Sequence, residues 1–364
     1  MKIKKAIFLK RLNRFTVQCY SGNRKLNAYL PNPGRLWELL IPGRILYLKK
    51  NRGNFNFKVF ATLRENELIC LDTHHTNNVV KEILKEGFIK DLKSYKLKEE
   101  EIRIGNKRID FLLEKGGDLF PLEVKSCTLY NDGIAMFPDA VTERGRNHVE
   151  LIAKYKGIII FVVYFSKAEY FLPDFHTDPL FSRTLSEYRN SILIKPISIK
   201  LDEGGSFKFI KELKIPWHVY DREGKDKGSY IIYGELKEDI TIRIGELGRK
   251  FFEKGYYLYV GSAMNSLSKR VKRHLKKNKN VKWHIDYLIS YFENIKPIEI
   301  RSSEKIECAI SKELGSIYEN VEKFGSSDCK CKSHLYFSFK NPFEDERFIE
   351  ILLKYRISRL KNFI

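Results

Sequence analysis

The feature that most constrains the fold is one uninterrupted apolar run, from Ile158 to Phe165. A continuous run of β-branched and aromatic residues is typical of a strand buried on both faces, as in the centre of an α/β layer. The run is the longest apolar segment of the chain, and it is much shorter than the roughly 18 residues that a membrane span needs. We therefore predict an α/β core around this strand and no membrane-spanning helix.

The 364 residues divide into three segments of different character, which predicts a multidomain protein of the α+β and α/β classes. Residues 1–80 alternate short apolar runs with turn residues and predict a small β-barrel. Residues 81–221 mix helices with strands, including the buried one, and predict an α/β domain. Residues 222–364 follow a polar, glycine-containing junction and combine strands with a very basic helix, predicting a second α/β domain that ends in an amphipathic helix.

Helices are also predicted within these segments. We expect them at 79–91, at 141–155, near 179–190, and at about 283–293 and 304–314. Asp139 precedes the second helix and is predicted to be its N-cap.

The charge balance indicates a polyanionic partner. Lys and Arg number 67 against 46 Asp and Glu, a net charge of +21. Such an excess favours phosphate contacts, which release condensed counterions. The alternative is a solvated, lysine-rich surface on a heat-adapted protein. We expect nucleic acid before any motif is considered.

The six cysteines are thinly spread, and no secretory signal is recognised at the start of the sequence. We therefore expect a cytoplasmic protein with reduced thiols. Cys329, Cys331 and His334 form a C-x-C-x₂-H pattern, to which Cys308 would add a fourth zinc ligand. This spacing is not one of the common zinc patterns, so ordinary packing is the favoured interpretation and Zn²⁺ the alternative.

One group of residues has the composition of a phosphodiesterase site. Asp110 lies in a strand-like run, and Glu123 and Lys125 lie two apart in the next, so both point to one face. A hairpin turn at 115–118 would bring Asp110 beside Glu123. The two carboxylates would then hold Mg²⁺ or Mn²⁺, and Lys125 would stabilise developing negative charge. By spacing alone, an edge salt bridge of Lys125 in a plain hairpin is the simpler interpretation.

Residues 1 to about 220 resemble the sugar fermentation stimulation protein family, SfsA. The resembling stretches are RLNRF at 11–15, NPGRL at 32–36, RIDF at 108–111, PLEVKS at 121–126 and FPDAVTERG at 137–145. The resemblance implies an OB-like barrel followed by a PD-(D/E)xK nuclease-like domain. It implies Asp110, Glu123 and Lys125 as the motif residues, with Ile109 in place of the motif's proline. It also implies DNA binding and a link to the expression of sugar-use genes.

Several basic residues around this group are predicted to contact nucleic acid. Arg11, Arg14 and Arg35 are expected on loops or strand ends of the barrel, with the rigid Asn32-Pro33-Gly34 turn presenting Arg35. Arg144 and His148, four apart on the predicted helix, are expected to face a phosphate near the metal. An ordinary exposed helix side is the alternative for the last two.

Residues 228 to about 340 resemble a second family, DUF123, which is distantly similar to GIY-YIG nucleases. The resembling stretches include GSY at 228–230, YVGS at 259–262, RVKRH at 270–274, WHIDYL at 283–288 and FGSSDC at 324–329. By this resemblance Tyr230 and Tyr259 would flank a scissile phosphate, Arg270 or Arg273 would stabilise charge, and Glu307 would hold a metal. Lys269 and Arg273, on the basic helix that includes Lys277, are predicted to bind nucleic acid.

Together these features favour a DNA-binding protein with Mg²⁺-dependent, endonuclease-type phosphodiester hydrolysis at Asp110, Glu123 and Lys125. The alternatives are a non-catalytic DNA-binding regulator of sugar-metabolism genes and an RNA-processing protein. DNA is favoured over RNA as the partner, although no residue pattern separates the two.

Overall fold

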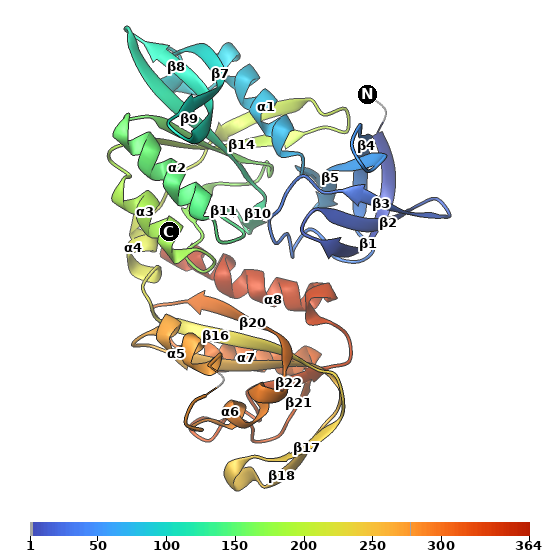
Figure 1. Cartoon of the computed structure of the whole chain (residues 1–364). Coiled ribbons are helices and arrows are strands. Elements are labelled where there is room, and N and C mark those ends of the chain that lie inside the picture. The colour runs from blue at the N-terminus through green and yellow to red at the C-terminus, as the bar shows by residue number, and fades with distance from the viewer. Residues whose placement is uncertain (1–2, 277) are drawn as a thin grey trace. The chain divides into compact units, whose positions relative to one another are not determined.

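The computed structural model describes residues 3–276 and 278–364, and Lys277, which was assigned to the basic helix, lies outside them. The chain forms two compact units, Met1–Trp217 and His218–Ile364 (Figure 1). No helix within the described ranges has the length and apolarity to cross a membrane.

The first part of unit 1 is a closed five-stranded barrel, which fits an OB fold. Its strands follow the order β3-β2-β1-β4-β5, and pairing of Tyr29 with Lys58 joins β3 to β5 and closes the barrel. Alternate residues such as Ala6, Phe8 and Val17 are buried inside it. The barrel strands are β1 (Ile3–Asn13), β2 (Thr16–Ser21), β3 (Arg24–Tyr29), β4 (Ile45–Lys50) and β5 (Phe57–Arg64).

The rest of unit 1 continues the same sheet into an α/β layer, in the order β6-β14-β12-β9-β8-β7. The predicted central strand is β12, whose six residues are all buried between parallel neighbours β9 and β14. The sheet strands are β6 (Glu67–Cys70), β7 (Lys96–Ile104), β8 (Lys107–Lys115), β9 (Asp118–Cys127), β12 (Ile158–Val163), β14 (Leu193–Leu201) and β15 (Phe207–Glu212). A small separate sheet consists of β10 (Leu129–Asn131), β11 (Ile134–Phe137) and β13 (Tyr170–Pro173).

Three helices accompany this layer: α1 (Thr73–Glu86), α2 (Glu143–Lys154) and α3 (Pro179–Glu187). Both α1 and α2 contact β9. The helix predicted at 79–91 is α1, which begins earlier than predicted, at Thr73, and also ends earlier. It ends because Gly87 adopts a left-handed φ of 67°. The predicted N-cap of α2 was also wrong. Thr142 caps the helix by accepting a hydrogen bond from the Gly145 amide, and Asp139 instead accepts one from the Leu36 amide of the barrel.

Unit 2 contains a five-stranded sheet in the order β20-β16-β19-β22-β21 and a two-stranded arm. The sheet strands are β16 (Gly228–Leu236), β19 (Gly255–Ala263), β20 (Glu293–Arg301), β21 (Glu319–Asn320) and β22 (Leu335–Ser338), and the arm consists of β17 (Ile240–Arg243) and β18 (Arg249–Phe252).

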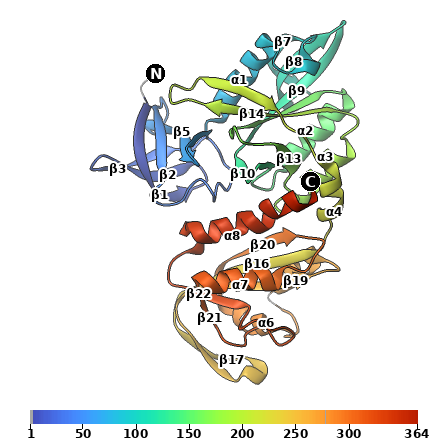
Figure 2. The same ribbon diagram turned by 180° about the vertical axis from the view of Figure 1, so that it is seen from behind.

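Helices α5 and α7 cover opposite faces of the five-stranded sheet, as the front and back views show (Figures 1 and 2). The helices associated with this unit are α4 (Trp217–Glu223), α5 (Leu267–His274), α6 (His284–Leu288), α7 (Glu307–Ile317) and α8 (Glu346–Arg356). The predicted helix at 283–293 is too long. Only α6 and a short 3₁₀ turn form there, and the edge strand β20 follows at Glu293.

Candidate functional site

Asp110 and Glu123 meet across the hairpin of β8 and β9. Phe111 pairs with Leu122, so the two acids lie side by side at the next position of the ladder. The Val124 amide donates to Asp110 Oδ2 at 2.8 Å, and Asn77 Nδ2 donates to Oδ1 at 2.9 Å. Burial and the charge of Glu123 raise the pKa of Asp110. The two carboxylates therefore repel each other in a poorly solvated place.

Glu123 is only 4% exposed, and its two oxygens have very different surroundings. Oε1 contacts Lys125 Nζ at 2.6 Å and His148 Nδ1 at 2.5 Å. Oε2 is buried and has no hydrogen-bond partner among the described residues. Burial alone would raise the pKa of Glu123, but Lys125 and His148 outweigh it and the pKa is lowered. The carboxylate is thus held charged with one oxygen unsatisfied.

A cleft of about 520 Å³ opens onto this pair within unit 1. Asp110, Glu123 and Lys125 form part of its wall, and Asn32, Pro33 and Gly34 of the barrel form another part. Exposed arginines also line it, namely Arg14, Arg108 and Arg144. The cleft therefore combines a carboxylate pair with cationic side chains, the combination that phosphodiester chemistry requires.

The barrel turn has a different role from the predicted one. Asn32 Oδ1 accepts the Gly34 amide at 2.9 Å, and a Cβ on Gly34 would overlap the Asp139 carboxylate. The turn is therefore docked against the α/β layer and forms cleft wall, whereas we expected it to present Arg35. Arg35 itself lies over the Trp37 ring, at 5.0 Å from the guanidinium carbon to the centroid.

Arg11 and His148 make hydrogen bonds within the protein, and their predicted phosphate contacts stay predictions. Arg11 donates to the carbonyls of Gly34 at 2.5 Å, Arg35 at 3.0 Å and Arg14 at 2.7 Å, so its guanidinium ties the turn together. His148 is 2% exposed and positions Glu123. Arg144 Nε, 3.4 Å from His148 Nε2, keeps an exposed side chain in the cleft.

Sequence reasoning did not find Asn77, which orients Asp110 from α1. The polar stretch His74 to Asn78 could have indicated it, but the helix was predicted to begin at residue 79, after this stretch. Asp139 was noticed only as a cap, although its contact with Leu36 links barrel and layer.

Unit 2 brings together most of its predicted residues on one side of its sheet. The rings of Tyr230 on β16 and Tyr259 on β19 lie 6.4 Å apart. Tyr230 Oη contacts His274 Nε2 at 2.8 Å, and His274 Nδ1 contacts Asp286 Oδ1 at 3.2 Å. Burial raises the pKa of Tyr230 to about 12, so this phenol stays protonated near neutral pH.

The basic side chains of α5 divide into two kinds. Lys269, Arg270 and Arg273 line a pocket of about 460 Å³, together with Lys305. Arg273 also forms an ion pair with Asp286 at 3.1 Å, so its charge is already engaged. Arg270 lies over the Trp283 ring at 4.3 Å.

Glu307 does not join the tyrosines. Among the described residues it makes no hydrogen bond to Tyr230, Tyr259 or Arg270, and its charge acts instead on Cys331 and His334. Its Oε2 is buried without a hydrogen-bond partner among the described residues, and its metal role stays a prediction.

Three family models match the chain in succession. The SfsA N-terminal OB domain matches residues 9–71, the sugar fermentation stimulation protein RE domain matches 74–205, and the domain of unknown function DUF123 matches 229–356.

Individual relatives agree with the first two matches. The sugar fermentation stimulation protein homolog of Moorella thermoacetica is 39% identical over 225 residues, covering 54% of this chain and 96% of its own. The homolog of Methanothermobacter thermautotrophicus is 36% identical over 186 residues, covering 49% and 78%. The solved structure of Pyrococcus furiosus SfsA in complex with Ca²⁺ covers 59% of this chain and 96% of its own, with 26% identity and a TM-score of 0.56. The chain belongs to the sugar fermentation stimulation protein family, and its unit 2 carries a DUF123 domain.

Proposed function

We propose that the unit 1 cleft binds nucleic acid, with DNA preferred, and hydrolyses a phosphodiester bond with the help of a divalent metal. The observation that carries the proposal is the buried, unpartnered Oε2 of Glu123 beside the Asp110 carboxylate. An unsatisfied buried oxygen costs free energy, and a hard cation would satisfy it while relieving the repulsion between the two acids. A PD-(D/E)xK-type domain is the corresponding fold proposal for residues 81–221.

Asp110 and Glu123 would hold the metal, Mg²⁺ or Mn²⁺. When bound, such an ion polarises phosphoryl oxygens and lowers the pKa of a ligated water. The related Pyrococcus furiosus protein was solved with Ca²⁺, another cation that takes oxygen ligands.

Three side chains would assist the carboxylates. Lys125, at 2.6 Å from Glu123 Oε1, is placed to donate to a phosphate oxygen as negative charge develops. His148 and Asn77 fix the orientations of Glu123 and Asp110 through the hydrogen bonds described above. The exposed Arg14 and Arg144 would contact the flanking phosphates, and Arg108 would do so on leaving its ion pair with Glu101.

One observation favours the non-catalytic alternative. Lys125 and His148 already compensate the charge of Glu123, so a DNA-binding protein could retain this group as a purely structural network. Cleavage therefore has to be measured separately from binding.

The test is nicking of supercoiled and branched DNA by the full chain in Mg²⁺ or Mn²⁺. Lys125→Ala should reduce the cleavage rate by about 10²–10³-fold, as loss of one preorganised donor does, while DNA binding is retained. Lys98→Ala is the matched control, because Lys98 lies on the neighbouring strand β7 in an exposed ion pair with Glu114. Binding without cleavage by the wild type, across metals and substrates, would instead favour the regulator.

For unit 2 we propose phosphate binding in the pocket of Lys269, Arg270 and Lys305. The protonated Tyr230 and the engaged Arg273 support binding more than GIY-YIG-type cleavage. Arg270→Ala should then weaken DNA binding without changing the cleavage rate at saturating DNA.

A further inference from the structure

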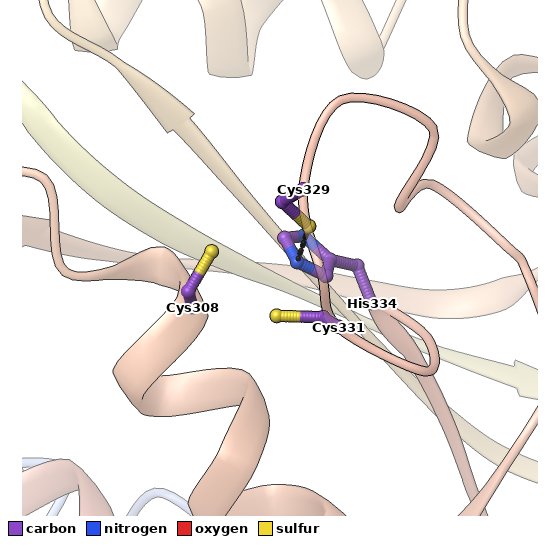
Figure 3. Close-up of side chains that lie close together, drawn as sticks. All are labelled: Cys308, Cys329, Cys331 and His334. Atoms are coloured by element: carbon purple, nitrogen blue, oxygen red, sulfur yellow. Dashed lines mark hydrogen bonds between the residues drawn. The ribbon is translucent and has the colours of Figure 1, made fainter.

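Three cysteines and one histidine of unit 2 converge from two separate segments. Cys308 lies in the first turn of α7, whereas Cys329, Cys331 and His334 belong to the loop that precedes β22. Figure 3 shows the three sulfur atoms and the imidazole pointing toward a common centre. The group belongs to unit 2, and none of its members serves the function proposed for the unit 1 cleft.

The spacing of the four groups matches tetrahedral coordination. Their ligand atoms all lie within 4.8 Å of one another, and Cys329 Sγ is 3.4 Å from His334 Nε2. A zinc ion with Zn–S bonds of about 2.3 Å sets its sulfur ligands about 3.8 Å apart. Small inward rotations of the side chains therefore suffice to close the coordination sphere.

The backbone on both sides of the cluster is already fixed. The His334 amide donates to the Phe324 carbonyl at 2.8 Å, and the Lys323 amide donates to the Lys332 carbonyl at 2.9 Å. The Val260 amide of β19 donates to the His334 carbonyl at 2.9 Å, so the backbone at this ligand is tied to the sheet.

The loop is otherwise attached through Ser333, whose hydroxyl donates to the backbone carbonyls of Val321 and Leu335, and it has little apolar surface. Residues 325–333, GSSDCKCKS, contain no apolar side chain apart from the two cysteines. Such a segment buries too little apolar surface to offset the entropy of ordering it. A metal that joins it to α7 would supply the missing free energy.

Three sulfur donors and one imidazole, with ligand atoms within 4.8 Å of one another, form a ligand set that suits a soft or borderline divalent ion. Such an ion would bind the cysteines as thiolates and the histidine as a neutral ring.

We propose that Cys308, Cys329, Cys331 and His334 bind one structural Zn²⁺ that clamps the 325–334 loop to helix α7. Four protein ligands leave no position for water or substrate, so the site is structural and not catalytic. Its sulfur donors select zinc, whereas the carboxylate oxygens of unit 1 select Mg²⁺ or Mn²⁺.

The full chain should be purified without a metal-affinity step and analysed for zinc by mass spectrometry of the elements. We expect one zinc ion per chain. Replacement by Co²⁺ should give the intense visible absorption of a tetrahedral thiolate site. Cys329→Ser and His334→Gln should lose the zinc, whereas the matched control Cys127→Ser, a buried cysteine outside the cluster, should keep it.

Two results would overturn the proposal, and neither depends on the variants folding. One is zinc-free wild-type protein whose cluster thiols all react freely and whose melting temperature is unchanged by added Zn²⁺ or by a chelator. The other is a disulfide between Cys308 and Cys331, seen as a mass loss of two hydrogens. DNA cleavage is not a readout here, so failure of this proposal leaves the unit 1 proposal untouched.

Discussion

Unit 1 buries Glu123 and unit 2 buries Asp286 beside cationic side chains, but of these two acids Glu123 alone keeps an oxygen without a partner among the described residues. Asp286 in unit 2 accepts hydrogen bonds from the Lys282 amide at 3.0 Å and the Trp283 amide at 3.1 Å. Arg273 contacts both of its oxygens, and His274 contacts Oδ1. Glu123 in unit 1 has both of its partners on Oε1, and its Oε2 has none among the described residues.

Burial of an acid beside basic side chains therefore does not by itself identify a reactive site. Asp286 is saturated, so its network stabilises the fold and has no vacancy for a metal. Glu123 retains an acceptor that the protein does not satisfy, next to the second carboxylate of Asp110 and an open cleft. Unsatisfied buried acceptors in native proteins call for an explanation, and an ion is one of the few available.

The largest expected effect is on the free energy of unfolding, and it concerns the saturated acid, Asp286. Asp286→Ala should lower the free energy of unfolding of unit 2 by about 3–5 kcal/mol, because Arg273 and the nearby Lys279 lose a fully buried partner. Denaturant unfolding of the full chain measures this. Glu319→Ala, at an exposed acid of the same unit, is the control. A loss of unfolding free energy below about 1 kcal/mol would mean that Asp286 contributes no more than an exposed ion pair does. The contrast between Asp286 and Glu123 would then fail.

A smaller effect separates the arginines of the two regions. Arg14 is exposed in the cleft and contacts the Phe15 ring, whereas Arg273 is held by Asp286. Arg14→Ala should weaken DNA binding. It should also reduce the steepness of the plot of log binding constant against log salt concentration by about 0.9, the value for one lost phosphate contact.

Arg183→Ala, in an exposed i,i+4 ion pair on α3, should leave the slope unchanged. Arg273→Ala should instead lower stability. An Arg14 variant with the wild-type slope would show that the cleft does not contact the DNA backbone.

The smallest effect is the opposite pH dependence of the two sites. Hydrogen bonds outweigh burial and lower the pKa of Asp286 from 3.8 to about 2, so its stabilisation is present above pH 4 and is lost as the pH falls toward 2. The pKa of Asp110 is raised above 3.8, so wild-type protein should gain stability relative to Asp110→Asn as the pH falls through that raised value. Unfolding free energies measured from pH 2 to 6 check both signs. Equal slopes for wild type and Asp110→Asn would contradict the repulsion between Asp110 and Glu123.

The sequence was informative where a pattern along the chain determines the geometry. The apolar run at 158–165 identified the central strand, and the Gly116-Gly117 turn set the hairpin that pairs Asp110 with Glu123. The division into domains at 1–80, 81–221 and 222–364 stays a prediction.

The partners across the fold were beyond the sequence. Nothing in the spacing shows that the Arg11 guanidinium donates to four backbone carbonyls, or that His148 is buried on Glu123. The C-x-C-x₂-H spacing is not a common zinc pattern and favours packing, whereas the fold brings the ligand atoms of Cys308 and the loop within 4.8 Å of one another. Periodicity predicts which face a residue occupies, and only the folded chain shows what faces it.

The most direct test of the central claim, that the open oxygen of Glu123 marks a metal site, is anomalous diffraction from crystals of the full chain soaked in Mn²⁺. We expect an Mn²⁺ peak within bonding distance of Glu123 Oε2 and an Asp110 oxygen, and no peak at Asp286. An occupied peak elsewhere with none at Asp110 and Glu123, or no peak at any Mn²⁺ concentration that the crystals tolerate, would contradict it.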